Sequence, residues 1–503
     1  MKRKIFKKLM AASLAAAMAV SMAGCGNGDN PASGSGSSEE SKPSDSAQPS
    51  DDGGSSEADN TGSDEESQPE EGVDKYTVLT DENGNPYDLG GMEIKIWSWF
   101  GDDPSDDEYG EARTEWREWI QETYNFTMSQ ETLGGWGDCP QSFVDYVTTG
   151  GDDNNYIFIG HSGAEMIAAM KQGLMYDVGS LDCLDFSERK FQLNGQCNLF
   201  SKGDAVYAFL TGYPEPRSGM YVNKRLLEQT TGMTADDLYD MQKENKWNWE
   251  SWEEIMKQIN ANGDVDNDGV QDIYPFAANT GAFVSSAVYS NGSSFFGMED
   301  GKYVCKLEDS KTLEALQWAS DMLGSYLYPQ PEGAEWDYFI AGFRDETKFV
   351  FLPEDAYNMQ PNGNLNTMED DFAFLMFPYG PGAGEYVNAY TDNVWALPGC
   401  YDADRAWKIM FAYNLWTEEI PGFEDYNPML SGYYNGARDI RTVEETLSRM
   451  MSEGATVKYE DFIPDIDMGN DLLWKVNFGG ADIAAAVEAC KTKWYTAVDE
   501  ANK

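Results

Sequence analysis

Apolar residues recur along this chain in two alternating patterns, one typical of strands and one typical of helices. Between residues 92 and 100, isoleucines alternate with charged residues, which predicts the first strand of a sheet. Residues 111–124 then place aromatic and apolar side chains at helical spacing, and further strands are expected at 126–128 and 155–161. Strands that alternate with amphipathic helices are typical of an α/β fold.

A break in this pattern separates two strand-like apolar runs, 205–210 and 219–222. The polar segment between them contains Pro214 and Pro216, which cannot donate to a strand ladder and therefore prevent one continuous strand. One strand ends and another begins, as happens where a chain leaves one lobe and enters a second. Ligands of open α/β folds bind in the crevice at such a place. The residues of this crossing that we expect to contact a ligand are Tyr213, Glu215 and Arg217.

The pattern continues to the C-terminus. Helices are expected at 311–328, 403–416 and 481–498, where apolar side chains recur at helical spacing. Residues 372–382 lead to a second crossing, after which 389–398 are expected to return as a strand of the first lobe. A tryptophan-rich stretch, 246–254, is expected to begin a helix whose tryptophans pack in the core, with Asn248 or Ser251 near its N-cap.

The first crossing resembles that of a known family. The motif consists of Gly203, Tyr207, Tyr221, Asn223, Lys224 and Leu226, and it has Leu210 at a position where a proline is usual. This spacing resembles the family 1 extracellular solute-binding proteins of ABC transporters, a sugar-binding lipoprotein type similar to maltose-binding protein. Residues 151–157, 173–178 and 247–254 resemble further motifs of the family, although no Pro-Asp pair stands before the third predicted strand.

The resemblance implies the fold class and the domain organisation. The expected fold is α/β, a two-lobed periplasmic-binding-protein-like fold of type II, in which each lobe is a mixed sheet flanked by helices and a ligand cleft lies between the lobes. From the order of the two crossings, we expect residues 76–212 and 387–429 in the first lobe. Residues 213–386 and 430–503 are expected in the second lobe.

The N-terminus has the order of features of a lipoprotein signal peptide. Basic residues come first, followed by an apolar stretch that is short for a membrane span, and then by small residues and Cys25. Residues 1–24 are therefore predicted to be removed, and Cys25 to carry the lipid, although Met22 replaces the usual leucine. Residues 25–75 are rich in Ser, Gly and acids, and we expect a disordered linker between the lipid anchor and the folded part.

The strongly negative net charge excludes some classes of binding partner. The formal net charge of −53 would repel nucleic acid and anionic membrane surfaces, so no nucleic-acid partner is expected.

The other cysteines have no metal-ligand spacing, and they can form disulfides in an exported protein or remain buried thiols. They are Cys139, Cys183, Cys197, Cys305, Cys400 and Cys490.

Several residues outside the first crossing are expected to contact the ligand. Trp99 and Phe100 lie at the carboxyl end of the first predicted strand, where α/β folds bind ligands, whereas Trp97 is expected to pack in the core. His161, the only histidine, ends the third strand and is either a structural hydrogen-bonding residue or a ligand contact. The resemblance adds ligand-facing positions at the loop after the first strand and at two aromatic residues, namely Asp102, Asp103, Tyr357 and Trp395.

Residues 264–272 have the ligand spacing of a calcium-binding loop. Asp264, Asp266 and Asp268 stand at positions 1, 3 and 5, the carbonyl of Val270 stands at position 7, and Asp272 stands at position 9. Position 12, normally a glutamate, is a proline, so the set is incomplete. The alternatives are a structural Ca²⁺ site and a solvated Asp-Gly turn. No organic cofactor is expected.

No motif for catalysis is recognisable in the sequence. There is no Gly-x-Ser-x-Gly, no phosphate-binding loop and no histidine cluster. A glycosidase would need two positioned carboxyl groups, and nothing in the sequence singles out such a pair among the 88 acidic residues. We therefore expect a non-enzyme: a lipid-anchored, monomeric, extracellular substrate-binding subunit of an ABC importer, whose partners are a carbohydrate, the permease subunits and the membrane. The alternative is a surface glycan-binding or structural lipoprotein without a transporter, which neighbouring permease genes would argue against.

Overall fold

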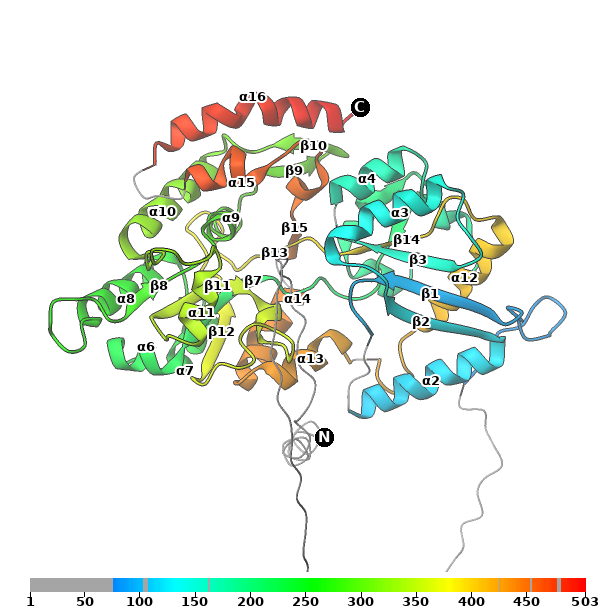
Figure 1. The fold of residues 1–503 in the computed structure, drawn as a ribbon, viewed down its shortest axis with the longest axis horizontal. Coiled ribbons are helices and arrows are strands. Elements are labelled where there is room, and N and C mark those ends of the chain that lie inside the picture. Colours follow the sequence, from blue (N-terminus) through cyan, green and yellow to red (C-terminus); the bar gives the residue numbers. More distant parts are fainter. Residues whose placement is uncertain (1–75, 103–106, 162, 425, 453–454, 477–480) are drawn as a thin grey trace, which may run out of the picture. The chain divides into compact units, whose positions relative to one another are not determined.

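The computed structural model describes residues 76–102, 107–161, 163–424, 426–452, 455–476 and 481–503. Within this part, the chain has the expected α/β fold with two main sheets, each flanked by helices, and three two-stranded sheets (Figure 1). Residues 1–75 lie outside the described residues, and so do the predicted signal peptide, the lipid attachment at Cys25 and the linker. Among the helices of the described part, none is long and apolar enough to cross a membrane.

The first sheet has the strand order β2-β1-β3-β14-β6. β1 pairs in parallel with β2 and β3, whereas β14 is antiparallel to both β3 and β6, so the sheet is mixed as expected. The last two strands are short and come from the two crossings. The bounds are β1 (Met92–Ser98), β2 (Phe126–Thr132), β3 (Asn155–Gly160), β6 (Ala208–Phe209) and β14 (Val394–Ala396).

Side-chain alternation along these strands divides the first lobe into two cores. Ile94 and Ile96 of β1 pack in one core, and Trp97 packs in the other, because successive side chains point to opposite faces. The first core is covered by α2 (Glu108–Tyr124) and α12 (Ala403–Trp416), and the second by α3 (Cys139–Thr148) and α4 (Gly163–Lys171). In Figure 1, α2 lies below this sheet and α3 and α4 lie above it.

The second sheet has the strand order β12-β7-β11-β8, in which β7 is antiparallel to both of its neighbours and β11 is parallel to β8. One large core surrounds it and includes the buried Trp247, Trp249 and Trp252, as predicted. Its strands are β7 (Ser218–Asn223), β8 (Tyr274–Phe276), β11 (Phe349–Asp355) and β12 (Phe372–Met376). The helices around it are α6 (Lys224–Thr231), α7 (Ala235–Lys243), α8 (Trp249–Asn262), α9 (Thr280–Ser290), α10 (Ser310–Tyr326), α11 (Tyr338–Arg344), α13 (Pro428–Gly436) and α16 (Ile483–Ala501).

Helix starts follow local sequence rules. The side chain of Asn248 accepts a hydrogen bond from the amide of Ser251 and caps α8, so the predicted N-cap is confirmed. The predicted helix at 403–416 coincides with α12, and the one at 481–498 is observed as α16. A short antiparallel pair, β9 (Phe296–Glu299) with β10 (Lys302–Cys305), follows α9.

Both crossings are more interrupted than the apolar pattern predicts. The run at 205–210 is divided into β5 (Ala205–Val206), which pairs with β4 (Ser201–Lys202), and β6, which pairs with β14. The single strand predicted at 389–398 was wrong. Instead, β13 (Asn388–Tyr390) pairs with β15 (Ala455–Val457), and only β14 joins the first sheet. Residue alternation cannot reveal which partner a short strand will pair with.

All six cysteines of the described part are free thiols. Cys139 and Cys490 are buried, and the others are partly buried. Burial raises the pKa of Cys139 and of Cys183 to about 12, so these thiols stay protonated and unreactive at neutral pH. Of the two alternatives left open by the sequence, the structure therefore has small buried side chains at these positions.

Candidate functional site

The two crossings are held together by a partly buried ion cluster, which we call the crossing cluster (Glu215, Arg217 and Asp392). Nη2 of Arg217 lies 2.9 Å from Oε2 of Glu215 and 3.3 Å from Oδ1 of Asp392. The same nitrogen donates to the carbonyl oxygen of Thr391 at 2.7 Å. A single guanidinium from the first crossing therefore bridges to backbone and carboxylate groups of the second.

Electrostatics in the crossing cluster are set by burial and by the one cation. Burial raises the pKa of Glu215 and of Asp392, although Arg217 acts against this increase. Burial also acts to lower the pKa of Arg217, but the two carboxylates outweigh it and the pKa is raised. Arg217 thus remains charged, and it is the group on which both buried acids depend.

Amide side chains extend the crossing cluster. Asn194 donates to Oδ2 of Asp392 at 2.6 Å, and Asn388 accepts from the amide of Arg217 at 3.1 Å. Sequence reasoning missed Asp392 and Asn194. The signal for Asp392 was its position between two short apolar runs in the second crossing, the counterpart of Glu215 in the first. Asn194 has no comparable signal, because its partner is 198 residues away.

A second group, the aromatic cluster, lies at the carboxyl ends of β1 and β3. Trp99 and Phe100 follow β1, and His161 follows β3 directly, so parallel pairing of these strands brings the three residues together. The ring centroids of Trp99 and His161 are 5.8 Å apart, and those of Trp99 and Phe100 are 5.5 Å apart. Burial lowers the pKa of His161, so its ring is neutral at neutral pH.

Trp136 is the aromatic residue that sequence reasoning missed. Its ring stacks on His161 with centroids 3.9 Å apart and an interplanar angle of 16°. Although one face is covered in this way, 62% of the residue is exposed. The sequence signal was an aromatic residue in the Gly-rich loop 134–137, which fits neither a strand nor a helix pattern. An exposed flat ring held from behind is suited to stacking on a ligand.

The remaining predicted residues lie in varied surroundings. Asp102 is bound to the guanidinium groups of Arg113 and Arg117 on α2, and these two cations keep its pKa low against the effect of burial. Asp103 lies outside the described residues. Tyr213 accepts a hydrogen bond from Nη2 of Arg189 at 2.7 Å. Asp102 and Tyr213 therefore have partners within the protein.

Tyr357 and Trp395 differ in exposure. Tyr357 is 43% exposed and lies two residues after the end of β11, at the end of the second sheet. Two acids, Glu354 and Asp355, precede it, and burial together with the charge of Asp355 raises the pKa of Glu354 to about 7. Trp395 is half-buried in β14, where it pairs with Ile159 and Phe209 and packs against both cores of the first lobe.

The predicted calcium loop lies between α8 and β8. Carboxylate oxygens of Asp264, Asp266 and Asp268 come within 4.8 Å of one another. Asp264 also accepts hydrogen bonds from the amides of Asp268 and Gly269, at 3.1 and 2.9 Å, which folds the loop around it. The side chain of Asp272 accepts from the amide of Val265. Oxygen ligands gathered in this way fit a hard cation, although Pro275 offers no side-chain oxygen at position 12.

Two sheets joined by paired crossings, with polar and aromatic groups at the strand ends, define the fold of two-lobed binding proteins. No family model matches the chain, and no curated protein matches it in sequence. Among solved structures, the chain is similar to UgpB from Mycobacterium tuberculosis in complex with glycerophosphocholine. The two share 14% identity and a TM-score of 0.54, over 82% of this chain and 100% of that one.

Two further solved structures have the same fold. The cyclic α-maltosyl-1,6-maltose binding protein from Arthrobacter globiformis is 14% identical, with a TM-score of 0.55 over 82% of this chain and 100% of that one. The ABC transporter associated binding protein from B. animalis subsp. lactis, in complex with β-1,6-galactobiose, is 13% identical, with a TM-score of 0.51 over 82% of this chain and 98% of that one. At sequence identities of 13–14%, the similarity to these structures shows the fold alone.

Proposed function

We propose that this chain is a lipid-anchored, extracellular substrate-binding subunit of an ABC importer, and that it captures an oligosaccharide between its two lobes. It acts as a binding protein and not as an enzyme. The observation that carries this proposal is the aromatic cluster at the strand ends of the first lobe, on the fold of known binding proteins. The lipid anchor rests on the signal-peptide pattern that ends at Cys25.

The chemistry of the two clusters suits a sugar. Aromatic faces such as that of Trp136 stack on the apolar faces of pyranose rings, and carboxylates and guanidinium groups bind hydroxyls. Glu215 contributes one such carboxylate at the first crossing, where its neighbour Arg217 holds it in place. Tyr357 offers an exposed ring beyond the end of the second sheet. Binding closes the lobes only if the ligand contacts both of them better in the closed state.

The test is a thermal-shift screen against a library of neutral and acidic carbohydrates, followed by calorimetry on each hit. We expect Trp136→Ala, Tyr357→Ala and Trp395→Ala to weaken affinity about tenfold or more, since loss of a stacked ring costs roughly 1–3 kcal/mol. Trp336→Ala is the matched control, because Trp336 is 71% exposed and precedes α11. Unchanged affinity in all three variants, or no hit at all, would contradict the proposal.

We also propose that the loop 264–272 binds Ca²⁺ as a structural ion. Its support is the ligand spacing and the presence of four carboxylates in nine residues, three of them clustered, which would otherwise repel one another. The residues that would hold the ion are Asp264, Asp266, Asp268, the carbonyl of Val270 and Asp272. The ion would offset half of the negative charge of the four aspartates in this loop and strengthen the connection between α8 and β8.

A further inference from the structure

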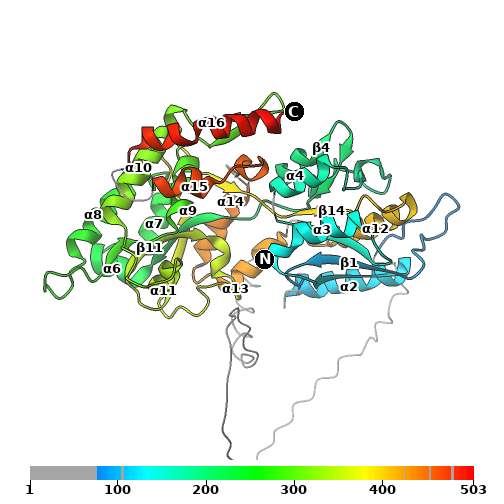
Figure 2. The same cartoon turned by 45° about the horizontal axis from the view of Figure 1, so that its top comes forward.

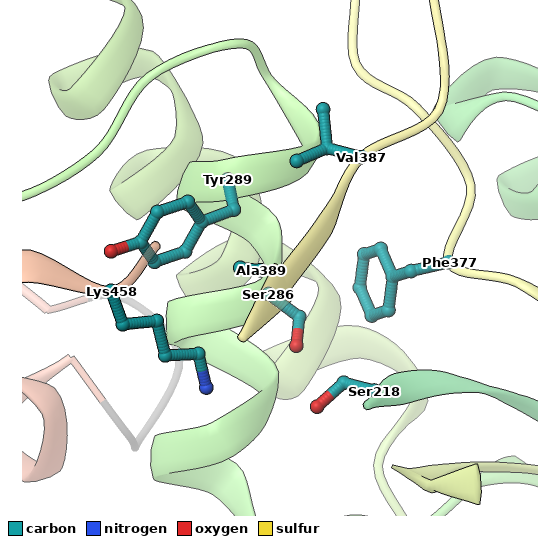
Figure 3. A pocket seen from close by; sticks show the side chains of 7 residues that line it. All are labelled: Ser218, Ser286, Tyr289, Phe377, Val387, Ala389 and Lys458. Carbon is teal, nitrogen blue, oxygen red and sulfur yellow. The ribbon is translucent and has the colours of Figure 1, made fainter. Parts of the chain in front are cut away.

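A small pocket lies beside the crossings, on the side of the second sheet. It is open to solvent, and its interior of about 10 Å³ has room for one water-sized group. Ser218 at the start of β7, Ser286 on α9 and Lys458 after β15 form its polar side (Figure 3). Phe377 and Val387 form an apolar side opposite. Three separate parts of the chain therefore place an amine and two hydroxyls around one space, and two further parts supply the apolar wall.

The hydroxyls and the amine have different capacities for hydrogen bonding. The hydroxyl of Ser218 donates to Oδ1 of Asp355 at 2.7 Å, so only its lone pairs face the pocket. In the part of the chain that the structure describes, the hydroxyl of Ser286 and Nζ of Lys458 have no hydrogen-bond or ion-pair partner. Lys458 offers three donors and Ser286 offers one, whereas Ser218 can accept.

The acids next to Lys458 in sequence are hydrogen-bonded to other residues, although the charge of Lys458 still acts through space on Glu460 and opposes the rise of its pKa. The carboxyl of Glu460 accepts a hydrogen bond from the hydroxyl of Tyr289 at 2.6 Å, and burial raises the pKa of Glu460. The carboxylate of Asp461 accepts from the hydroxyl of Thr391 in the second crossing. In a chain with 88 acidic and 35 basic residues, a half-buried lysine in a pocket without a bonded carboxylate needs an explanation.

We infer that this pocket binds an oxyanion substituent of the ligand, a sugar carboxylate or a phosphate ester, so that the captured carbohydrate is an acidic one. One oxygen of the oxyanion fits this space, where it accepts from the amine of Lys458 and the hydroxyl of Ser286, while the carbon skeleton that bears the oxyanion lies outside, at the open mouth of the pocket. A charged group held in this way is bound more strongly than a neutral hydroxyl. The negative net charge of the protein slows the approach of an anion, but salt screens it at distances beyond about 8 Å.

The place of the pocket connects it to the proposed ligand site. Ser218 directly follows Arg217 of the crossing cluster, and its partner Asp355 stands two residues before Tyr357. Val387 and Ala389 of the second crossing also line the pocket. A sugar ring at Glu215 and Tyr357 can therefore extend a substituent toward Lys458. This inference rests on the proposed function for its choice of ligand, but the pocket is testable by itself.

The first experiment observes the lysine directly in the full folded chain. Lysines are reductively dimethylated with ¹³C, which keeps their charge, and the Lys458 resonance is assigned by its loss in Lys458→Arg. Sodium glucuronate and glycerol 2-phosphate are titrated separately, with glucose at equal ionic strength as the control. We expect a saturable shift of the Lys458 resonance with at least one of the two anions and none with glucose. The inference is wrong if neither anion moves this resonance more than that of the exposed Lys302.

The two anions separate the two sources of an oxyanion. A shift with glucuronate alone assigns the pocket to carboxylates, and a shift with glycerol 2-phosphate alone assigns it to phosphate esters. Both results support the inference. Ser286→Ala should reduce the shift, because it removes one donor from the same pocket.

The second experiment compares an oligogalacturonate with the same oligosaccharide methyl-esterified at each carboxylate. We expect calorimetry to show at least tenfold tighter binding of the acid, and we expect Lys458→Met to remove this preference while Lys458→Arg retains most of it. Lys302→Met is the control and should leave the preference unchanged. Equal binding of both forms by the wild type and by Lys458→Met would refute the inference and leave the proposed function standing. If neither form binds, the proposed function loses this sugar class, and the Lys458 resonance alone decides about the pocket.

Discussion

Two groups of acidic side chains in this protein lie in opposite surroundings. The carboxylates at the crossings, Glu215 and Asp392, are largely buried and share one guanidinium, that of Arg217. The carboxylates of the loop at 264–268 are mostly exposed, and in the described part of the chain they bond to backbone amides and to no side-chain cation. Buried acids need a cation supplied by the fold, whereas exposed acids can take one from solution. The predictions below test this difference.

The largest effect is expected from Arg217→Met. This change leaves two largely buried carboxylates without a cation. Breaking a fully buried ion pair costs about 3–5 kcal/mol, and we expect the lower end of this range because the Glu215 side chain keeps 30% of its surface exposed. The midpoint of denaturant-induced unfolding should fall accordingly, and the pKa of both acids should rise further. If the free energy of unfolding of Arg217→Met stays within about 1 kcal/mol of the wild-type value, the crossing cluster does not hold the two crossings together.

The next effect concerns pH. Burial and Asp355 raise the pKa of Glu354 to about 7, above the ordinary 4.5 of an unfolded chain, so the folded state binds the proton more tightly. This carboxyl therefore costs stability as pH rises from about 4.5 to 7, and the cost is complete above pH 7. Glu354→Gln should raise the unfolding free energy at pH 8 by about 1–3 kcal/mol and leave it little changed at pH 4.

Melting curves from pH 4 to pH 8 measure this difference. Glu82→Gln is the matched control, since Glu82 is exposed and should give a curve parallel to that of the wild type. If the difference in melting temperature between Glu354→Gln and the wild type is the same at all pH values, the pKa of Glu354 is the same in the folded and unfolded states, and the prediction is wrong.

A smaller effect is expected at the proposed calcium loop. At 1 mM calcium and a dissociation constant of roughly 0.2 mM, an ion that binds only the folded state stabilises it by about 1 kcal/mol. Chelation should therefore lower the melting temperature of the wild type but not that of the double variant Asp264→Asn and Asp268→Asn. Asp153→Asn with Glu82→Gln is the control pair, since both residues are exposed acids elsewhere. Identical wild-type curves with calcium and with chelator would dismiss the site.

The smallest effect is expected from an exposed ion pair on a helix. Lys408 and Asp404 lie one turn apart on α12, with Nζ and Oδ2 at 2.7 Å. Such pairs contribute about 0.2–0.5 kcal/mol, so Lys408→Gln should shift the unfolding midpoint barely beyond error. An effect as large as that of Arg217→Met would mean that burial does not separate the two kinds of ion pair.

Much of the fold was predictable because local patterns decide it. Alternating isoleucines predict β1, helical spacing predicts α2, and an asparagine before a tryptophan-rich stretch predicts the start of α8. The end of β1 and the end of β3 were also predictable, and with them the meeting of Trp99 and His161. The strand partners at the crossings were not, because strands of two or three residues carry too little pattern to select a neighbour.

By itself, the sequence determined the two-lobed α/β architecture, the crossing with Glu215 and Arg217, and the acidic loop at 264–272, because periodicity, proline positions and short-range spacing are local properties. Only the tertiary structure decided that Asp392 shares Arg217, that Trp136 stacks on His161, and that Lys458 faces a pocket with Ser218 and Ser286. These pairings join residues that are far apart in the chain. They depend on how sheets pack and strands end, which no local pattern encodes.

Figures 1 and 2 both show to which lobe these distant segments belong. In Figure 2, β14 from the second crossing lies with the first-lobe strands, while α9 and β11 belong to the other lobe. The segment from the end of β15 onward contributes Val457 and Phe462 to a first-lobe core and Ile463 to the second-lobe core. A contiguous sequence motif reports the chemistry of its own residues. The packing of separate segments determines which of those residues face one another, because side-chain contacts form only after the sheets are assembled.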